Sequence, residues 1–190
     1  MVNFHSTLYK LSASSCGALV TIPFDILQTK AMCNKNIEFK LDEFKYMFYM
    51  VILFTLQSIV YDSSKFLKSQ TLRGALSGLA SSPIYIYVER KKLESRLQIY
   101  PKIKNGILWI TIRQILLFTT LYNILNSNIY YSKFLSAFCA NLIGFPLRLI
   151  ALKKSYNNLN INYNCIKITC ILEILKSTLG DGITLTLINI

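Results

Sequence analysis

Long apolar stretches alternate with short polar runs along the chain, and this pattern predicts six helices. The stretches cover approximately residues 8–30, 44–66, 72–92, 107–125, 133–153 and 166–190. Each is close to the ~20 residues that a helix needs to cross the hydrocarbon core of a bilayer. Polar runs such as Asn34-Lys35-Asn36 separate the stretches. We therefore predict an all-α membrane protein with six transmembrane helices.

The odd-numbered stretches share a spacing of residues around a proline, which indicates an internal repeat. Pro23, Pro83 and Pro146 recur at intervals of 60 and 63 residues. Small residues stand nine, six and two positions before each proline, and a basic residue stands seven after it. Small residues let membrane helices approach closely, and a proline inside a helix kinks it. Chance agreement among common small residues is the alternative explanation.

The repeat predicts one domain over residues 1–190, built from three helical hairpins in pseudo-threefold order. The hairpins cover about residues 1–70, 71–131 and 132–190. Composition favours a membrane location, because 53% of the residues are hydrophobic and only 16% are charged, with a mean hydropathy of +0.40. Soluble domains carry about 25% charged residues.

Enzyme and metal chemistry have little support in the sequence. The five cysteines include no CxxC pair, and His5 is the single histidine. A zinc site needs a cluster of Cys and His ligands, and a disulfide framework needs an even number of cysteines. We therefore expect no metal and no cofactor. The nine acidic residues are expected mostly outside the helices, and no catalytic set is recognisable among them. We expect the protein not to be an enzyme.

Residues 16–30, Cys-Gly-Ala-Leu-Val-Thr-Ile-Pro-Phe-Asp-Ile-Leu-Gln-Thr-Lys, resemble the signature of the mitochondrial carrier family. That signature has a proline, an acid two positions later, a basic residue five positions later and often another at seven. Pro23, Asp25 and Lys30 match it, whereas Gln28 stands in place of the basic residue at position five.

The second and third copies of the signature are less complete. The second copy keeps Pro83 and Arg90, and the third keeps Pro146 and Lys153. Arg148 stands where the third copy should have an acid. The repeats are also shorter than those of the family, because the loops between odd and even helices are reduced.

A second motif of the family lies at the cytoplasmic ends of its even helices: an aromatic residue, an acid, two others and a base. Tyr61-Asp62-Ser63-Ser64-Lys65 is similar to it, and Tyr122-Asn123-Ile124-Leu125-Asn126 is a neutral counterpart. In the family, ion pairs between odd helices close the matrix side and ion pairs between even helices close the cytoplasmic side. Carriers of the family open alternately to each side of the membrane.

The resemblance therefore implies two gates in this chain. We hypothesise that Asp25 and Arg148 form a single substitute ion pair at the matrix gate; the alternative is that Arg148 snorkels to the membrane interface. The matrix-gate candidates are Pro23, Asp25, Gln28, Lys30, Pro83, Arg90, Pro146, Arg148 and Lys153. The cytoplasmic-gate candidates are Tyr61, Asp62, Lys65, Tyr122, Asn123 and Asn126.

Ionisable residues inside apolar stretches are functional candidates, because a charge is costly to hold in a membrane. Arg113 and Lys176 are such residues, and two cations around a central cavity suit an anionic solute. The alternatives are that Arg113 pairs with a polar group of another helix and that Lys176 snorkels. The resemblance also implies contact positions for the substrate on the even helices, at a fixed distance along the chain from the family's motifs. Together these give the substrate-binding candidates Tyr49, Ile110, Thr111, Arg113, Lys176 and Ser177.

Charge placement agrees with the orientation that the resemblance implies. If the odd stretches run towards the matrix, thirteen of the 21 Lys and Arg flank the matrix side and five flank the other. Basic residues are enriched on the negative side of a membrane. They flank loops and do not gather on one soluble module, so we expect contact with the lipid bilayer, anionic lipid included, and not with nucleic acid.

The sequence thus leads to one main functional hypothesis and two alternatives. The main one is a monomeric carrier of a small anionic solute, with adenine nucleotide as one candidate, in the inner membrane of a mitochondrion or a related organelle. The first alternative is a carrier-derived scaffold that no longer transports, which the degenerate gates favour. The second is an unrelated six-helix membrane protein.

Overall fold

A computed structural model of the chain describes residues 4–33, 43–97, 106–125, 132–155 and 166–188. Every regular element in these ranges is helical, which confirms the all-α prediction. The elements are α1 (Phe4–Cys33), α2 (Glu43–Ser63), the short 3-10 helix η1 (Ser64–Phe66), α3 (Gln70–Leu97), α4 (Ile107–Leu125), α5 (Ser132–Ser155) and α6 (Ile166–Ile188).

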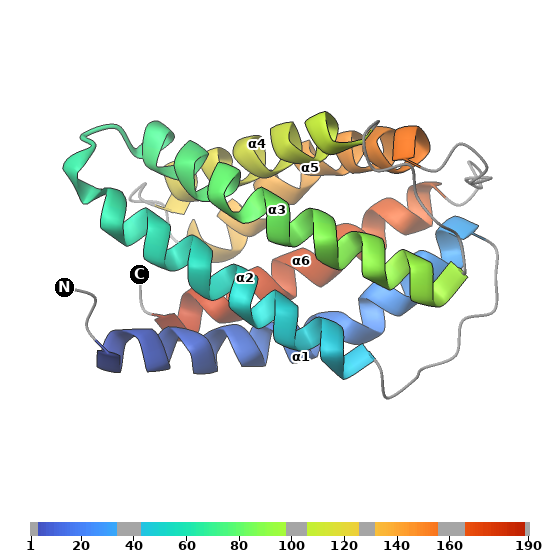
Figure 1. Cartoon of the computed structure of the whole chain (residues 1–190), viewed down its shortest axis with the longest axis horizontal. Coiled ribbons are helices and arrows are strands. Elements are labelled where there is room, and N and C mark those ends of the chain that lie inside the picture. Colours follow the sequence, from blue (N-terminus) through green and yellow to red (C-terminus); the bar gives the residue numbers. More distant parts are fainter. Residues whose placement is uncertain (1–3, 34–42, 98–105, 126–131, 156–165, 189–190) are drawn as a thin grey trace.

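The six helices form a closed ring in chain order. Each helix packs on the next along the chain, and α6 packs on α1. Because the helices alternate in direction, the start of α1 and the end of α6 lie at one end of the ring (Figure 1). We call this the termini end, and the opposite end, where α1, α3 and α5 finish, the distal end.

The odd helices present equivalent positions to the inside and the outside of the ring. Pro23, Pro83 and Pro146 lie within α1, α3 and α5, and all three are exposed. The residues two and five positions after each proline are buried, and so are the small residues nine and six positions before it. The buried residues that follow the prolines are Asp25, Gln28, Tyr85, Val88, Arg148 and Ala151.

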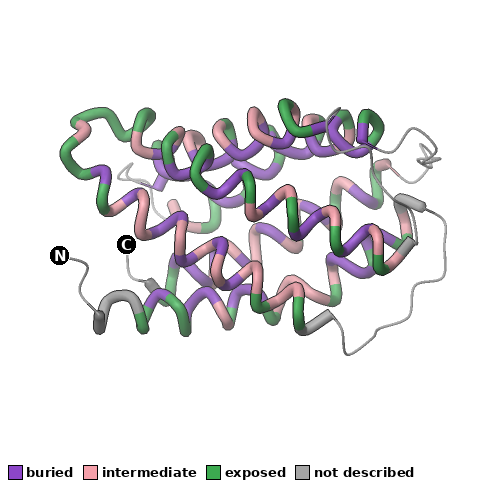
Figure 2. The backbone as a smooth tube through the Cα atoms, in the orientation of Figure 1, coloured by how far each residue is buried: buried purple, intermediate pink, exposed green. Residues whose placement is uncertain are grey.

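The interior of the ring contains as many polar as apolar residues, and large apolar residues are exposed on its outer surface. Among the described residues, 24 polar or charged side chains are buried, against 21 hydrophobic ones. Exposed large hydrophobic side chains occur on all six helices, and Figure 2 shows exposed positions recurring along each of them. The share of buried polar and charged residues is high compared with a soluble domain, where charged residues are rarely buried.

Three helical segments within the described residues are long and apolar enough to cross a membrane: Lys45–Phe66, Ile107–Leu125 and Ser132–Ser155. They belong to α2 with η1, α4 and α5. The prediction that all six helices cross the membrane is therefore supported for three of them and stays a prediction for α1, α3 and α6.

The charged end of α3 is the main departure from the predicted boundaries. The apolar pattern ends at Lys92, but the helix continues to Leu97. The last turns carry charged residues that pair with other helices, so hydropathy alone does not register them. The expectation that the acids lie mostly outside the helices is also wrong, because seven of the nine are helical.

Candidate functional site

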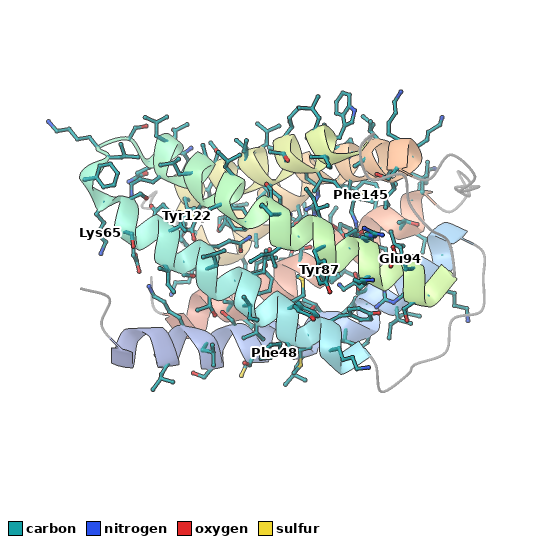
Figure 3. The ribbon with its side chains drawn as sticks, viewed as in Figure 1. Phe48, Lys65, Tyr87, Glu94, Tyr122 and Phe145 are labelled. Carbon is teal, nitrogen blue, oxygen red and sulfur yellow. The ribbon has the colours of Figure 1, made fainter. Side chains whose placement is uncertain are left out.

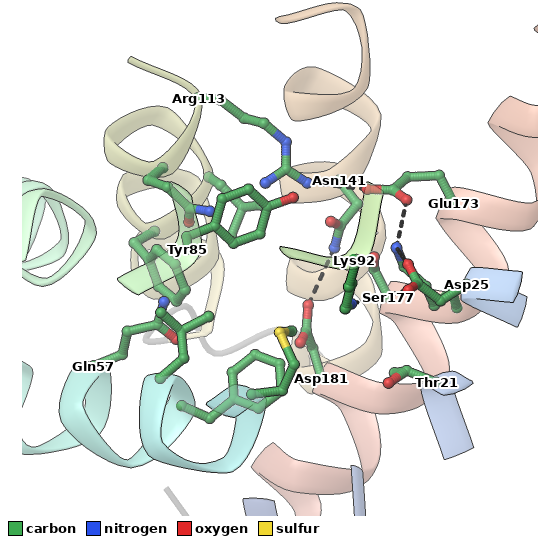
Figure 4. Close-up of a pocket in the computed structure, with 17 residues that line it drawn as sticks. Thr21, Asp25, Gln57, Tyr85, Lys92, Arg113, Asn141, Glu173, Ser177 and Asp181 are labelled. Carbon is green, nitrogen blue, oxygen red and sulfur yellow. Dashed lines mark hydrogen bonds and ion pairs between the residues drawn. The ribbon is translucent and has the colours of Figure 1, made fainter. Parts of the chain in front are cut away.

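A cavity of about 530 Å³ lies inside the ring, and its lining residues come from all six helices (Figure 4). The lining combines apolar side chains, mainly from α2 and α4, with charged and polar groups from all six helices. We call this cavity the chamber. Its charged lining residues are Asp25, Lys92, Arg113, Glu173, Lys176 and Asp181.

Arg148 on α5 connects four helices on the distal side of the chamber. Its Nε and Nη2 donate to Oε1 of Glu89 on α3, at 3.0 and 2.6 Å. Its Nη1 donates to Oε1 of Gln28 on α1 at 2.7 Å and also pairs with Glu173 on α6. The guanidinium is therefore surrounded by acceptors from three neighbouring helices, which suits its planar set of donors.

Asp25 on α1 is the second centre of contacts. Its carboxylate accepts from Nζ of Lys92 at 2.9 Å and from Nη1 of Arg96 at 3.0 Å, both on α3. It also accepts from Nζ of Lys176 on α6 at 3.1 Å. Nη2 of Arg148 is farther away, at 3.9 Å. Asp25 thus ties α1 to α3 and α6.

Arg113 on α4 adds a third connection to this set. Its Nη2 donates to Oε1 of Glu173 at 3.0 Å, and its guanidinium carbon lies 5.1 Å from the centre of the Tyr85 ring. Its Nε is buried and has no hydrogen-bond partner among the described residues. We call the interconnected residues the ion network: Asp25, Gln28, Glu89, Lys92, Arg96, Arg113, Arg148, Glu173 and Lys176.

Helical periodicity explains why α3 contributes so many members. Tyr85, Glu89, Lys92 and Arg96 follow one another at intervals of four, three and four residues. Residues at such intervals share one face of a helix. This spacing is visible in the sequence. A comparison with the carrier signature does not reveal it, because Glu89 falls between the positions that the signature specifies.

The hypothesis of a single Asp25–Arg148 ion pair is wrong in its simple form. The two residues do come together, but each has nearer partners within the ion network. The snorkelling alternatives for Arg148 and Lys176 are also wrong, because the side chain of Arg148 is only 7% exposed and that of Lys176 13%. The alternative that Arg113 pairs with another helix is confirmed by its contact with Glu173.

The remaining matrix-gate candidates lie away from the ion network. Arg90 pairs with Glu94 on its own helix. Lys30 and Lys153 are exposed on the outer surface, because the seventh position after the proline turns away from the interior. The prolines Pro23, Pro83 and Pro146 are exposed as well.

The substrate-binding candidates divide into two groups. Arg113, Lys176 and Ser177 line the chamber. Tyr49, Ile110 and Thr111 are not among its lining residues, which corrects that part of the prediction.

Packing between helices accounts for the misplaced candidates. Tyr49 packs edge-on against Tyr87 of α3, with ring centres 5.5 Å apart. Ile110 belongs to a hydrophobic cluster with Leu53, Tyr85 and Ala151. The residues that do line the chamber on α2 and α4 include Leu53 and Gln114, each about one helical turn after the expected position.

Aromatic packing closes the termini end. The rings of Tyr61 on α2 and Tyr122 on α4 are stacked, with centres 3.6 Å apart and planes at 9°. Arg73 lies over Tyr61, 4.0 Å from the ring centre, and donates to its carbonyl oxygen at 3.2 Å. Lys10 pairs with Asp62 close by. Figure 3 shows Tyr122 on this side of the molecule and Glu94 towards the distal end.

The cytoplasmic-gate candidates are therefore only partly connected as the resemblance implies. The Tyr61–Tyr122 stack does join two even helices. Asp62, however, pairs with α1, and Lys65 is 4.0 Å from it on the following turn. Asn123 bonds to Thr71 on α3 at 3.3 Å, and Asn126 lies outside the described residues.

Comparisons with protein-family models, curated proteins and solved structures find no match to this chain. Within the described ranges, no group of three or more His, Cys, Asp or Glu side chains is placed to hold a metal ion. What the chamber offers a bound molecule is ion pairing, hydrogen bonding and apolar contact.

Proposed function

We propose that this chain is a monomeric membrane transporter of a small anionic solute, with the architecture of a shortened mitochondrial carrier. The observation that carries the proposal is the chamber itself. It is lined by every helix of the ring, and ligand sites are common between the helices of bundles. A polar chamber inside an apolar ring is costly unless it accommodates a polar molecule.

Repeated positions around the chamber support the pseudo-threefold architecture. Gln57, Phe118 and Asp181 all line the chamber, one on each even helix, at intervals of 61 and 63 residues. These intervals are close to those of the three prolines. Together with the three apolar segments, they support six membrane-crossing helices in three hairpins.

Lys92, Arg113 and Lys176 line the chamber and supply its positive charge. Of these, Arg113 has a buried Nε without a hydrogen-bond partner among the described residues. A guanidinium binds carboxylate or phosphate through paired hydrogen bonds, so a free donor beside the chamber favours an anionic group. Adenine nucleotide is one candidate solute.

Two closures of different chemistry support alternating access. The ion network links α1, α3, α5 and α6 on the distal side, and the Tyr61–Tyr122 stack joins α2 and α4 at the termini end. Transport requires each closure to open in turn, and binding of the solute must offset that cost. The resemblance and the basic loops support a location in the mitochondrial inner membrane, in contact with anionic lipid.

Reconstitution tests the proposal directly. Purified protein in liposomes is expected to take up labelled nucleotide, phosphate or carboxylate. Arg113→Gln should lower that uptake about tenfold or more, because it removes a charged hydrogen-bond donor. Lys154→Gln, which neutralises an exposed residue on α5, should leave uptake unchanged. No uptake of any anion, together with no thermal stabilisation by one, would contradict the proposal.

The extent of the ion network favours a second candidate, a carrier-derived scaffold without transport. Five cations pair with three acids there, and separating such buried pairs is expensive. A ring that stays closed would present only its outer surface to partners. The liposome experiment distinguishes the two, because a scaffold responds to no solute in either measurement.

A further inference from the structure

Asp181 on α6 differs from the other acids of the chamber. Asp25 and Glu173 each contact several cations at 3.1 Å or less. Asp181 accepts a hydrogen bond from the Nδ2 of Asn141 at 3.2 Å, and it has no ion-pair partner among the described residues. A carboxylate held inside a helix ring without a cation is costly.

Two unpartnered polar side chains line the cavities beside this carboxylate. Gln57 on α2 is 2% exposed, and neither its Oε1 nor its Nε2 has a hydrogen-bond partner among the described residues. Thr184 on α6 is 6% exposed, and its hydroxyl also has no partner in the described part of the chain. Buried polar atoms are almost always hydrogen-bonded, so each such group calls for an explanation.

A second cavity connects these groups to the chamber. It has a volume of about 340 Å³ and is lined by Asp181, Gln57 and Thr184. Gln57, Asp181 and the rings of Phe54 and Phe118 line both this cavity and the chamber. Figure 4 shows Gln57 and Asp181 on the chamber wall, with the Asn141–Asp181 bond dashed.

The geometry points to a binding site for a protonated amino group at Asp181, Gln57 and Thr184. A carboxylate, an amide oxygen and a hydroxyl supply acceptors for the N–H donors of an ammonium, which has three donors and no acceptor. Phe54 and Phe118 also line both cavities, and aromatic rings attract cations. This inference rests on the proposed function, and it makes the solute zwitterionic, with its anionic group near Arg113 and its ammonium at Asp181.

Matched solutes test this assignment. The thermal unfolding temperature of the purified protein is measured against increasing concentrations of 6-aminohexanoate, hexanoate and hexylamine, and of 4-aminobutyrate, butyrate and butylamine. At least one zwitterion should reach half-maximal stabilisation at a concentration about tenfold or more below that of its matched anion. Asp181→Asn should remove this preference, whereas Glu94→Gln, at a carboxylate paired with Arg90 and Lys91 away from the chamber, should retain it.

Each remaining outcome has one meaning. If the anions stabilise as well as the zwitterions and Asp181→Asn changes nothing, the ammonium site is overturned while the proposed transporter stands. Stabilisation by the amines or by potassium chloride alone also overturns it, in favour of a simple cation site. No stabilisation by any of these solutes overturns the ammonium site, and the proposed transporter is then judged by the liposome uptake of nucleotide, phosphate and carboxylate. If Asp181→Asn does not purify as a folded protein, Gln57→Leu replaces it and should lower the zwitterion preference about threefold or more.

Discussion

Arg148 is the residue whose charge matters most directly for the integrity of the ring. Its guanidinium is buried and contacts Glu89, Glu173 and Gln28, which lie on three other helices. A buried ion pair contributes little relative to an apolar replacement of both partners, but removal of one partner leaves an uncompensated charge. Glu89 is the more vulnerable of the two acids, because Glu173 also contacts Arg113 and Lys176.

We predict that Arg148→Gln lowers the free energy of unfolding by about 3 kcal/mol or more, because it leaves Glu89 buried without its guanidinium. Thermal unfolding in detergent micelles, followed by circular dichroism, measures the change. Lys154→Gln on the same helix is the control and should stay near wild type, since exposed substitutions usually change stability by about 0.5 kcal/mol or less. Equal stability of the two variants would show that Arg148 is dispensable for the fold.

The sequence could identify some members of the ion network and not others for a simple reason. Arg113, Arg148 and Lys176 stand out because each is a cation inside an apolar stretch. Glu89 and Lys92 do not, because they lie in the charged last turns of α3, which hydropathy assigns to the edge of a loop. Their roles depend on contacts with distant residues, and those contacts appear only when the ring is assembled.

At the scale of elements, the packing of α3 on α4 depends on two glycines. A Cβ atom on Gly78 would lie 2.7 Å from the carbonyl carbon of Gln114, and one on Gly74 would lie 2.7 Å from the carbonyl oxygen of Phe118. Both neighbours are backbone atoms, which cannot rotate away as a side chain can. The two helices therefore need glycine here for their close approach, as small residues in membrane helices allow.

We predict that Gly78→Val strongly reduces the amount of folded protein, because its side chain would separate α3 from α4. The expected loss of stability exceeds the ~1–3 kcal/mol typical of overpacked cores, since the clash is with backbone. Size-exclusion chromatography of the purified variant and its unfolding temperature measure the effect. Leu79→Val is the control, because Leu79 is 50% exposed. A Gly78→Val protein as stable as this control would contradict the close packing.

The extent of each helix could largely be predicted from the apolar pattern, and the reasons for the exceptions are local. The stretch over residues 107–125 coincides with α4, since both ends are bounded by polar residues. The predicted end of α3 falls five residues short of Leu97, because the ion pairs of Lys92 and Arg96 help to hold these charged last turns. Helix–helix contact, such as Tyr49 against Tyr87, likewise has no counterpart in hydropathy.

At the scale of the whole molecule, the ring has two ends closed by different forces. Buried ion pairs hold the distal side. Stacked tyrosines hold the termini end, together with Arg73 over the Tyr61 ring and the Lys10–Asp62 pair, whose carboxylate is 38% exposed. The packing of α6 on α1 closes the ring. Hydropathy along the chain does not predict this contact, whereas the threefold repeat does. An aromatic pair is worth about 0.5–1.5 kcal/mol, so the termini end is the easier one to open.

This difference predicts the side from which the chamber becomes accessible. In a cysteine-free background, Ser177→Cys places a thiol on the chamber wall, and a charged maleimide reports access from water. Tyr61→Ala should speed labelling from the termini side about fivefold, the shift that corresponds to the loss of ~1 kcal/mol of stacking. Tyr61→Phe keeps the ring and should label at the original rate. Leu142→Cys, at an exposed apolar position on α5, should stay unlabelled in liposomes because lipid covers it. Equal rates for the alanine and phenylalanine variants would mean that the stack does not control entry, and labelling of Leu142→Cys would mean that the outer surface faces water and not lipid.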